Sequence, residues 1–319
     1  MRTTLFCVAL TITATTLHAA AAEYPERPIR FIVPYGAGSG PDITARLFAN
    51  ELSKQLGQQI VFDNRPGAGG SIGTEMIVRA PADGYTIGFG GISVFAINPA
   101  VIKLPYDPDK DLLKVVQTYF NPGMLAANLS LPVNSMKSLI DYAKNNPRKL
   151  SFGSSGNGTS SHLSGELLKI MTGTQMEHVP YKSPEQGITD TIGGRLPLMF
   201  NNIGPLLPHV KEGRLRGLGV TSPRRSPAIP ELPAIAETVH GFEVTVWGGV
   251  VVPAGVPKTI VAQLNAAINK VLAMPAMKEK YAAIGYEVVG GTPAQFDTYV
   301  KKEIAKWANV VKRSGAKLN

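Results

Sequence analysis

The chain has 319 residues, of which 44% are hydrophobic and 17% are charged, a balance that is typical of globular proteins and excludes a disordered chain. The formal net charge of +9 comes from scattered basic residues that are not interleaved with aromatic ones, so it does not favour a nucleic-acid-binding protein. Cys7 is the only cysteine, which excludes a disulfide framework.

Residues 1–22 predict a cleaved secretory signal peptide. Arg2 gives a short positive start, a mostly apolar stretch follows, and Ala20, Ala21 and Ala22 supply a small-residue cleavage site. The apolar stretch is shorter than the roughly 20 residues of a spanning helix. Cys7 lies inside this segment, so the mature chain would hold no disulfide, and we expect export to the periplasm.

Strand and helix patterns alternate after the signal, which predicts an α/β protein with largely parallel sheets. In chain order we expect strands at 29–35, 58–64 and 85–91, and then at 124–131, 149–155, 176–181, 196–202, 216–222 and 242–253. Helices are expected at 43–56, 135–147, 163–173, 188–194, 205–213, 257–272 and 294–315, with Asp42 as the cap of the first.

The pattern restarts near Asn121 and returns to the first set after residue 241, which predicts two lobes with a cleft between them. We assign residues 23–120 and 242–319 to lobe 1, and residues 121–241 to lobe 2. Two glycine-rich turns, GAGSG (36–40) and SSGNGTSSH (154–162), lie at carboxyl ends of predicted strands. Open α/β sheets bind ligands at such ends. We therefore expect the two turns to face each other.

The first glycine-rich turn follows the strand at 29–35 and could hold a dinucleotide, a smaller anion or no ligand. Asp63 ends the next strand, where a ribose-binding acid would lie. Pro41, however, replaces the third glycine of the dinucleotide pattern and offers no amide hydrogen. Asp42 would also repel a pyrophosphate, so a smaller anion or a capped turn without ligand is favoured over a dinucleotide.

The second glycine-rich turn places several hydroxyl groups at the start of a predicted helix, an arrangement that suits a carboxylate. A nucleophilic Ser154 or Ser155 in an exported hydrolase is the alternative, although the G-x-S-x-G elbow is absent and only His162 is near. No metal-ligand spacing occurs, and we expect neither a metal nor a cofactor.

Several longer stretches carry a resemblance to a known family. They are NRPGAGGSIGTEMIVRAPADGYT (64–86), KLSFGSSGNGTSSHLSGELLK (149–169), HVPYKS (178–183) and GGTPAQFDTYVKKEIAKWANVVKRSG (290–315). In these the chain resembles the Bug receptors, the TctC-like periplasmic substrate-binding proteins of the tripartite tricarboxylate transporters. The resemblance covers nearly all of the mature chain.

The resemblance implies a two-lobe, type II-like periplasmic binding protein that is not an enzyme. It implies capture of a small mono- or dicarboxylate and delivery to a permease with a large and a small membrane subunit; we expect a monomer that binds no nucleic acid. A receptor for a signalling partner stays open as an alternative. The ligand-binding positions carried over are Tyr35, Gly36, Ala37, Gly38, Ser39, Ser93, Ser154, Thr159, Ser160, Tyr181 and Asn201.

The chain departs from the family pattern at positions that bear on the choice of ligand. Ala37, Ser39 and Pro41 are unusual in the first turn, and aspartate is more usual at Asn201. Glu185, in the loop after Tyr181, could meet a cationic group. These departures leave the identity of the acid open and do not affect the expected role.

Overall fold

The computed structural model describes residues 24–314, so the predicted signal peptide lies outside the described residues. The strands are β1 (Ile29–Val33), β2 (Ile60–Asn64), β3 (Thr86–Gly91), β4 (Leu112–Ala127), β5 (Leu150–Ser154), β6 (Met176–Pro180), β7 (Leu198–Asn202), β8 (Arg216–Val220), β9 (Thr245–Pro253) and β10 (Glu287–Val288). The α-helices are α1 (Gly40–Leu56), α2 (Ser71–Val78), α3 (Asn98–Val101), α4 (Met136–Asn145), α5 (Ser160–Thr172), α6 (Pro184–Ile192), α7 (Ile203–Lys211), α8 (Lys258–Leu272), α9 (Pro275–Ala283) and α10 (Pro293–Ser314). Three short helical turns are η1 (Ala68–Gly70), η2 (Ser93–Ile97) and η3 (Ile235–Glu237).

The strands form one path in the order β2-β1-β3-β9-β4-β7-β5-β6, with β8 and β10 also paired to β4. Pairing is parallel among β1, β2 and β3 and among β5, β6 and β7, whereas β4 and β9 run antiparallel to their neighbours. The predicted α/β class is confirmed, but the sheet is mixed rather than largely parallel.

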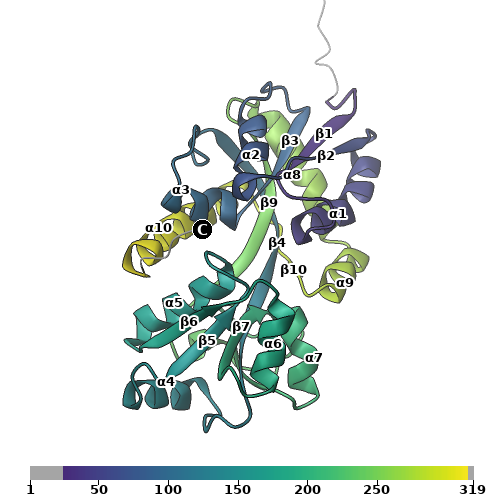
Figure 1. The fold of residues 1–319 in the computed structure, drawn as a ribbon. Helices are drawn as coiled ribbons and strands as arrows, with labels where there is room; N and C mark the ends of the chain where they lie inside the picture. Colours follow the sequence, from purple (N-terminus) through teal and green to yellow (C-terminus); the bar gives the residue numbers. More distant parts are fainter. Residues whose placement is uncertain (1–23, 315–319) are drawn as a thin grey trace, which may run out of the picture.

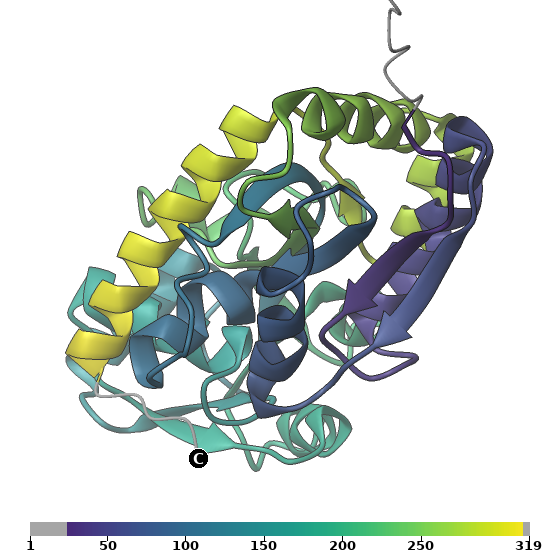
Figure 2. The same ribbon diagram turned by 90° about the horizontal axis from the view of Figure 1, so that it is seen from above.

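The molecule has two lobes joined by β4 and β9 (Figure 1). The first lobe holds β1 to β3 with α1, α2 and α8, and the second holds β5 to β7 with α4 to α7. The predicted lobe limits at residues 121 and 242 fall in β4 and just before β9, and they stay a prediction. Helix α10 packs against η2 and β4 and also against α5, and Figure 2 shows it along one side of the molecule.

The carboxyl ends of the strands in both lobes point toward the region where β4 and β9 join them. In the first lobe the last residue of β3, Gly91, lies opposite Gly248 near the start of β9. In the second lobe the last residue of β7, Asn202, lies opposite Gly123 of β4. Because β4 and β9 pair with each other in this region, the turns after the strands of both lobes approach the same place.

Helix α1 begins where the chain leaves the buried strand β1. Its N-cap is Ser39 and not Asp42, which lies in the first turn of the helix and is 2% exposed. Phe48 and Leu52 are fully buried on one face, as the helical spacing predicts. Gly57 ends the helix in the left-handed conformation with φ 66°, which favours glycine.

Two parts of the fold differ from the sequence prediction. Strand β4 begins at Leu112, well before the predicted residue 124, and helices α2 and α9 were not predicted. Within residues 24–314 no single helix is long and apolar enough to cross a bilayer; only α8 and α9 taken together, bent by 74°, reach that length and composition.

Candidate functional site

The first turn (residues 35–39) joins β1 to α1 and is held in shape by a buried carboxylate. Oδ2 of Asp42 accepts the backbone N–H of Gly38 at 2.8 Å. Arg46 and Asn64 donate to the same side chain at 2.9 Å each. Burial raises the pKa of Asp42, but the hydrogen bonds from Arg46, Asn64 and Gly38 outweigh it and bring the pKa below its usual range. Asp42 therefore orders the turn.

Tyr35 and Ser93, both predicted site residues, lie together at the ends of β1 and β3. Burial raises the pKa of Tyr35 to about 12, and the nearby Ser93 side chain opposes this rise. Asn64 Nδ2 donates to the Tyr35 carbonyl at 3.1 Å, which fixes the start of the turn. The tyrosine is therefore a neutral wall of the site.

The first turn has hydrogen-bond donors that are not used by the described part of the protein. Within residues 24–314 the backbone amides of Gly36 and Ala37 have no protein acceptor, and both residues are exposed. The hydroxyl of Ser39 is buried and has no hydrogen-bond partner among the described residues. An unsatisfied buried polar group costs about 1–3 kcal/mol. A ligand, a water or a closing of the lobes that supplies a partner for the Ser39 hydroxyl would therefore stabilise the first turn.

The second turn (residues 154–159) is instead satisfied largely by its own side chains. Ser154 is fully buried, its Oγ lies 2.6 Å from Nε2 of His178, and it accepts the Gly156 N–H at 3.1 Å. His162 accepts the Gly158 N–H on Nδ1 at 3.0 Å. The hydroxyl of Ser154 is therefore used to hold the turn.

The two histidines stack, with ring centroids 3.8 Å apart, beneath the second turn. Burial lowers the pKa of His162, and burial together with His162 and Lys169 lowers the pKa of His178 to about 4. Both imidazoles are therefore neutral near pH 7, as acceptance of the Gly158 N–H by His162 requires.

Thr159 and Ser160 are adjacent but differ in how their hydroxyls are used. Thr159 is the N-cap of α5: its hydroxyl accepts from the His162 backbone N–H and donates to the Gly156 carbonyl at 2.7 Å. Ser160 is the first residue of α5, and its hydroxyl has no protein partner within the described chain. Of the two, Ser160 has the hydroxyl that is free to bind a ligand.

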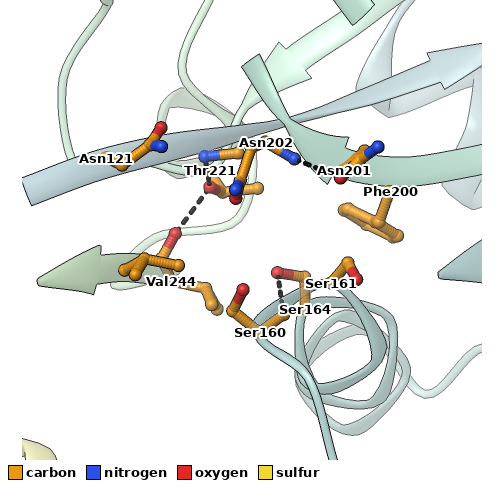
Figure 3. Close-up of a pocket in the computed structure, with 11 residues that line it drawn as sticks. Asn121, Ser160, Ser161, Ser164, Phe200, Asn201, Asn202, Thr221 and Val244 are labelled. Carbon is orange, nitrogen blue, oxygen red and sulfur yellow. Dashed lines mark hydrogen bonds between the residues drawn. The ribbon is translucent and has the colours of Figure 1, made fainter. Parts of the chain in front are cut away.

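A small pocket lies between α5, β7 and the joining strands (Figure 3). Its enclosed space of about 10 Å³ is roughly that of one water molecule. Figure 3 shows the side chains of Ser160 and Asn202 pointing toward each other across it. All its lining residues are uncharged: Asn121, Gly123, Ser160, Ser161, Ser164, Phe200, Asn201, Asn202, Thr221, Val244 and Val246.

The pocket lies at two helix starts, a position that favours negative charge. Ser160 begins α5, and Asn202 is the N-cap of α7 with no side-chain capping bond. Amide groups at helix starts attract anions. The backbone N–H of Asn202 donates to Oδ1 of Asn201 at 2.8 Å. Its side-chain amide has no hydrogen-bond partner within residues 24–314, so it can hydrogen-bond a ligand.

Two further predicted residues lie at strand ends of the second lobe. Asn201 Oδ1 accepts the Ser155 hydroxyl at 3.1 Å, while its Nδ2 is buried and unpartnered within the described residues. Tyr181 donates its hydroxyl to Asp190 at 3.1 Å, so this hydroxyl is engaged on α6.

Sequence reasoning missed Asn121, Asn202 and Thr221. Thr221 accepts the Gly123 N–H and donates to the Val244 carbonyl, and so ties the two joining strands together. Only the strand register brings these residues to the pocket; the one available signal was their position at the ends of predicted strands. Within residues 24–314 no three His, Cys, Asp or Glu side chains are grouped to hold a metal.

Comparison with known proteins assigns this arrangement to a family. The model of the tripartite tricarboxylate transporter family receptor matches residues 44–316. The chain belongs to this receptor family. The resemblance seen in the sequence is therefore confirmed.

Related proteins match the receptor over nearly its whole length. Protein BugT of Bordetella pertussis is 36% identical over 93% of this chain and 92% of its own. The solved structure of R. palustris Rpa4515 with adipate is 38% identical, with a TM-score of 0.73 over 93% of this chain and all of its own. MatC of Rhodopseudomonas palustris with bound malate is 28% identical, with a TM-score of 0.69 over 90% of this chain and all of its own.

These relatives decide against the hydrolase alternative, because the family consists of substrate-binding receptors; the chain is a receptor and not an enzyme. The geometry agrees with this. Ser154 is 0% exposed and its hydroxyl is held by His178 and Gly156. Ser155 donates to Asn201 and has no histidine partner among the described residues.

Proposed function

We propose that this receptor acts in the periplasm, captures a small mono- or dicarboxylate between its two lobes, and delivers it to the large and small membrane subunits of a tripartite tricarboxylate transporter. The proposed contacts are the first turn and Ser93 from one lobe, and Ser160 and Asn201 with Asn202 from the other. Ser154, Thr159 and Tyr181 would shape the site without binding the ligand, which their neighbours would contact.

One observation carries the proposal: uncharged donors without protein partners are found where the strand ends of both lobes meet. The first lobe offers the amides of Gly36 and Ala37, and the second offers Ser160 and Asn202 at two helix starts. A carboxylate accepts about four hydrogen bonds. Such donors stabilise an anion without a counter-ion, as charge-assisted hydrogen bonds do.

Two facts add support. The family relatives with adipate and malate were solved with carboxylates bound. The net charge of +9 gives the receptor a positive field, which raises the rate at which small anions arrive.

The test is thermal unfolding of the mature receptor in the presence of mono-, di- and hydroxycarboxylates, with matched amines as controls. A ligand present at 100 times its Kd adds about 2.7 kcal/mol to the free energy of unfolding. A carboxylate that raises the midpoint, while the matched amine does not, supports the proposal. If no carboxylate moves the midpoint, the proposed ligand class is wrong.

Delivery and location need separate experiments. Export is tested by cell fractionation, with the mature chain expected in the periplasmic fraction. Delivery is tested by uptake of the labelled acid in cells with and without the receptor. Co-purification of a signalling protein instead of two transporter subunits would favour the sensor alternative.

A further inference from the structure

The turn between α9 and β10 lies directly beside the small pocket. Asn121 lines the pocket, and the acceptors around its side chain assign Nδ2 to the side that faces the Gly285 carbonyl, 3.2 Å away. The same side chain lies near Tyr286, where it opposes the rise that burial causes in the pKa of Tyr286. One wall of the pocket is therefore backed by Gly285 and Tyr286.

Tyr286 also reaches the first turn. A β-carbon placed on Gly40, the first residue of α1, would lie 2.2 Å from the Tyr286 hydroxyl oxygen, so the phenol occupies the space beside the helix start. Its ring packs edge-on against Tyr119 with centroids 4.9 Å apart. The side chain thus spans from the joining strand β4 to the start of α1.

The same turn contacts the second lobe. A β-carbon on Gly285 would lie 3.7 Å from Cα of Gly204 in the first turn of α7. Figure 1 places α9 between α1 and α7 beside the joining strands. Gly285 and Tyr286 therefore form a partition that touches both lobes where the predicted ligand contacts converge.

A larger pocket lies on the other side of this partition. Its volume is about 420 Å³, and its walls include Ser226, Ala228, Lys278, Ala282, Tyr286 and Val288. Tyr286 lines this pocket, and the neighbouring Asn121 lines the smaller one. The side chains of Asn121 and Tyr286 separate these two pockets, and Tyr286 lies between the larger pocket and Gly40 at the start of α1.

We propose that Tyr286 is a specificity-determining residue that sets the length of the acid, because its ring closes the ligand site off from the 420 Å³ pocket behind it. This inference rests on the proposed carboxylate-binding function. Shortening the side chain opens the larger pocket toward the start of α1 beside the first turn. A longer aliphatic chain can then enter it along Ala228, Ala282 and Val288, although Lys278 and Glu287 also line it. Each additional buried methylene improves affinity about fourfold.

The test uses isothermal titration of straight-chain mono- and dicarboxylates of four to ten carbons against the full mature receptor. Tyr286→Leu and Tyr286→Ala are compared with the wild type, and Tyr286→Phe keeps the ring without its hydroxyl. Tyr142→Leu, the same change on α4 away from the cleft, is the matched control. Thermal unfolding of each variant establishes that it is folded.

We expect the affinity for the eight-carbon acid relative to the four-carbon acid to rise at least tenfold in Tyr286→Leu or Tyr286→Ala. The ratio should stay within about twofold in Tyr286→Phe and Tyr142→Leu. An unchanged ratio in both shortened variants, with normal binding of the best acid, overturns the role of Tyr286 alone. Failure of the wild type to bind any of these acids instead overturns the proposed function on which the inference rests.

Discussion

Oγ of Ser154 and Nε2 of His178 lie 2.6 Å apart and connect the second turn to strand β6. His178 stacks on His162, which accepts the backbone N–H of Gly158 in the same turn. Burial, with contributions from His162 and Lys169, lowers the pKa of His178 from 6.5 to about 4. The shape of the second turn therefore depends on imidazoles that stay neutral.

This arrangement predicts that acid destabilises the receptor between pH 6.5 and 4. Because the pKa of His178 is lower in the folded chain than in the unfolded chain, the unfolded chain binds more protons in this window. The contribution of the neutral His178 imidazole to the free energy of unfolding is complete above pH 6.5 and is lost as the pH falls toward 4. Each unit of difference between the pKa values of the unfolded and the folded chain corresponds to about 1.4 kcal/mol. The contribution of His178 is therefore at most about 3 kcal/mol.

Urea unfolding at several pH values checks this prediction in the wild type and in His178→Gln. The variant should lose part of the pH dependence, since His162 still contributes, while His240→Gln at an exposed position should retain all of it. A His178→Gln variant with the wild-type slope between pH 4 and 6.5 would contradict the assignment.

Thr159 and Ser160 are predicted to respond differently to the same change. Thr159→Ala removes the N-cap of α5 and should lower the free energy of unfolding by about 0.5–2 kcal/mol. Ser160→Ala removes a hydroxyl without a protein partner in the described chain, so stability should change by less than about 0.5 kcal/mol.

For ligand binding, in contrast to stability, Ser160→Ala should have a larger effect than Thr159→Ala. A hydrogen bond to a charged group contributes about 1.5–3 kcal/mol, so Ser160→Ala should weaken binding of the best carboxylate at least about tenfold. Calorimetric titration and urea unfolding of both variants make the comparison. Equal binding by wild type and Ser160→Ala would remove Ser160 from the site and leave the turn as a structural element.

The sequence predicts two glycine- and hydroxyl-rich turns as ligand contacts because they follow strands in regular α/β order. The turns do follow β1 and β5, and their role in binding stays a prediction. The sequence could not predict how each hydroxyl is used. Ser154 and Thr159 look as suitable as Ser160 in the sequence, yet their hydrogen bonds go to His178 and to the turn itself. That choice depends on residues distant in the chain.

The fold was predicted well where apolar periodicity is strong and poorly where polar residues are buried. The first half of β4 was missed because Lys114 and Gln117 interrupt its apolar pattern, although both are buried. Lys114 is neutralised there by Asp109 at 2.8 Å. Asn202 was missed for a related reason, since only its pairing opposite Gly123 brings it to the pocket.

Asp42 gives a prediction about the first turn. Replacing it with Ala leaves the Gly38 N–H and Asn64 without their acceptor and breaks the contact with Arg46. We expect a loss of about 1–3 kcal/mol in the free energy of unfolding, with weaker carboxylate binding because the turn is no longer ordered. Glu26→Ala, at an exposed position before β1, is the control, and retention of both properties in Asp42→Ala would contradict the ordering role.

Glu303 links α10 to the joining strand β9 through hydrogen bonds. It is fully buried, and the indole N–H groups of Trp247 and Trp307 both donate to Oε2 at 3.0 Å. Lys306 forms an ion pair with Oε1. Since α10 contacts elements of both lobes, this carboxylate stabilises the region that joins them.

Glu303→Leu is expected to lower the free energy of unfolding by about 2–6 kcal/mol, because the two buried indole N–H groups lose their acceptor at about 1–3 kcal/mol each. Lys306 loses its ion pair but is partly exposed and still donates to the Glu243 carbonyl at 2.9 Å. Urea unfolding measures the loss, and Glu279→Leu on the exposed face of α9 should change stability by less than about 0.5 kcal/mol. The double variant Glu303→Leu with Lys306→Leu should stay about as unstable as the single one, since the two buried indole N–H groups still lack an acceptor. A double variant that regains half of the lost stability or more would show that the ion pair with Lys306, and not the two indole N–H groups, requires Glu303.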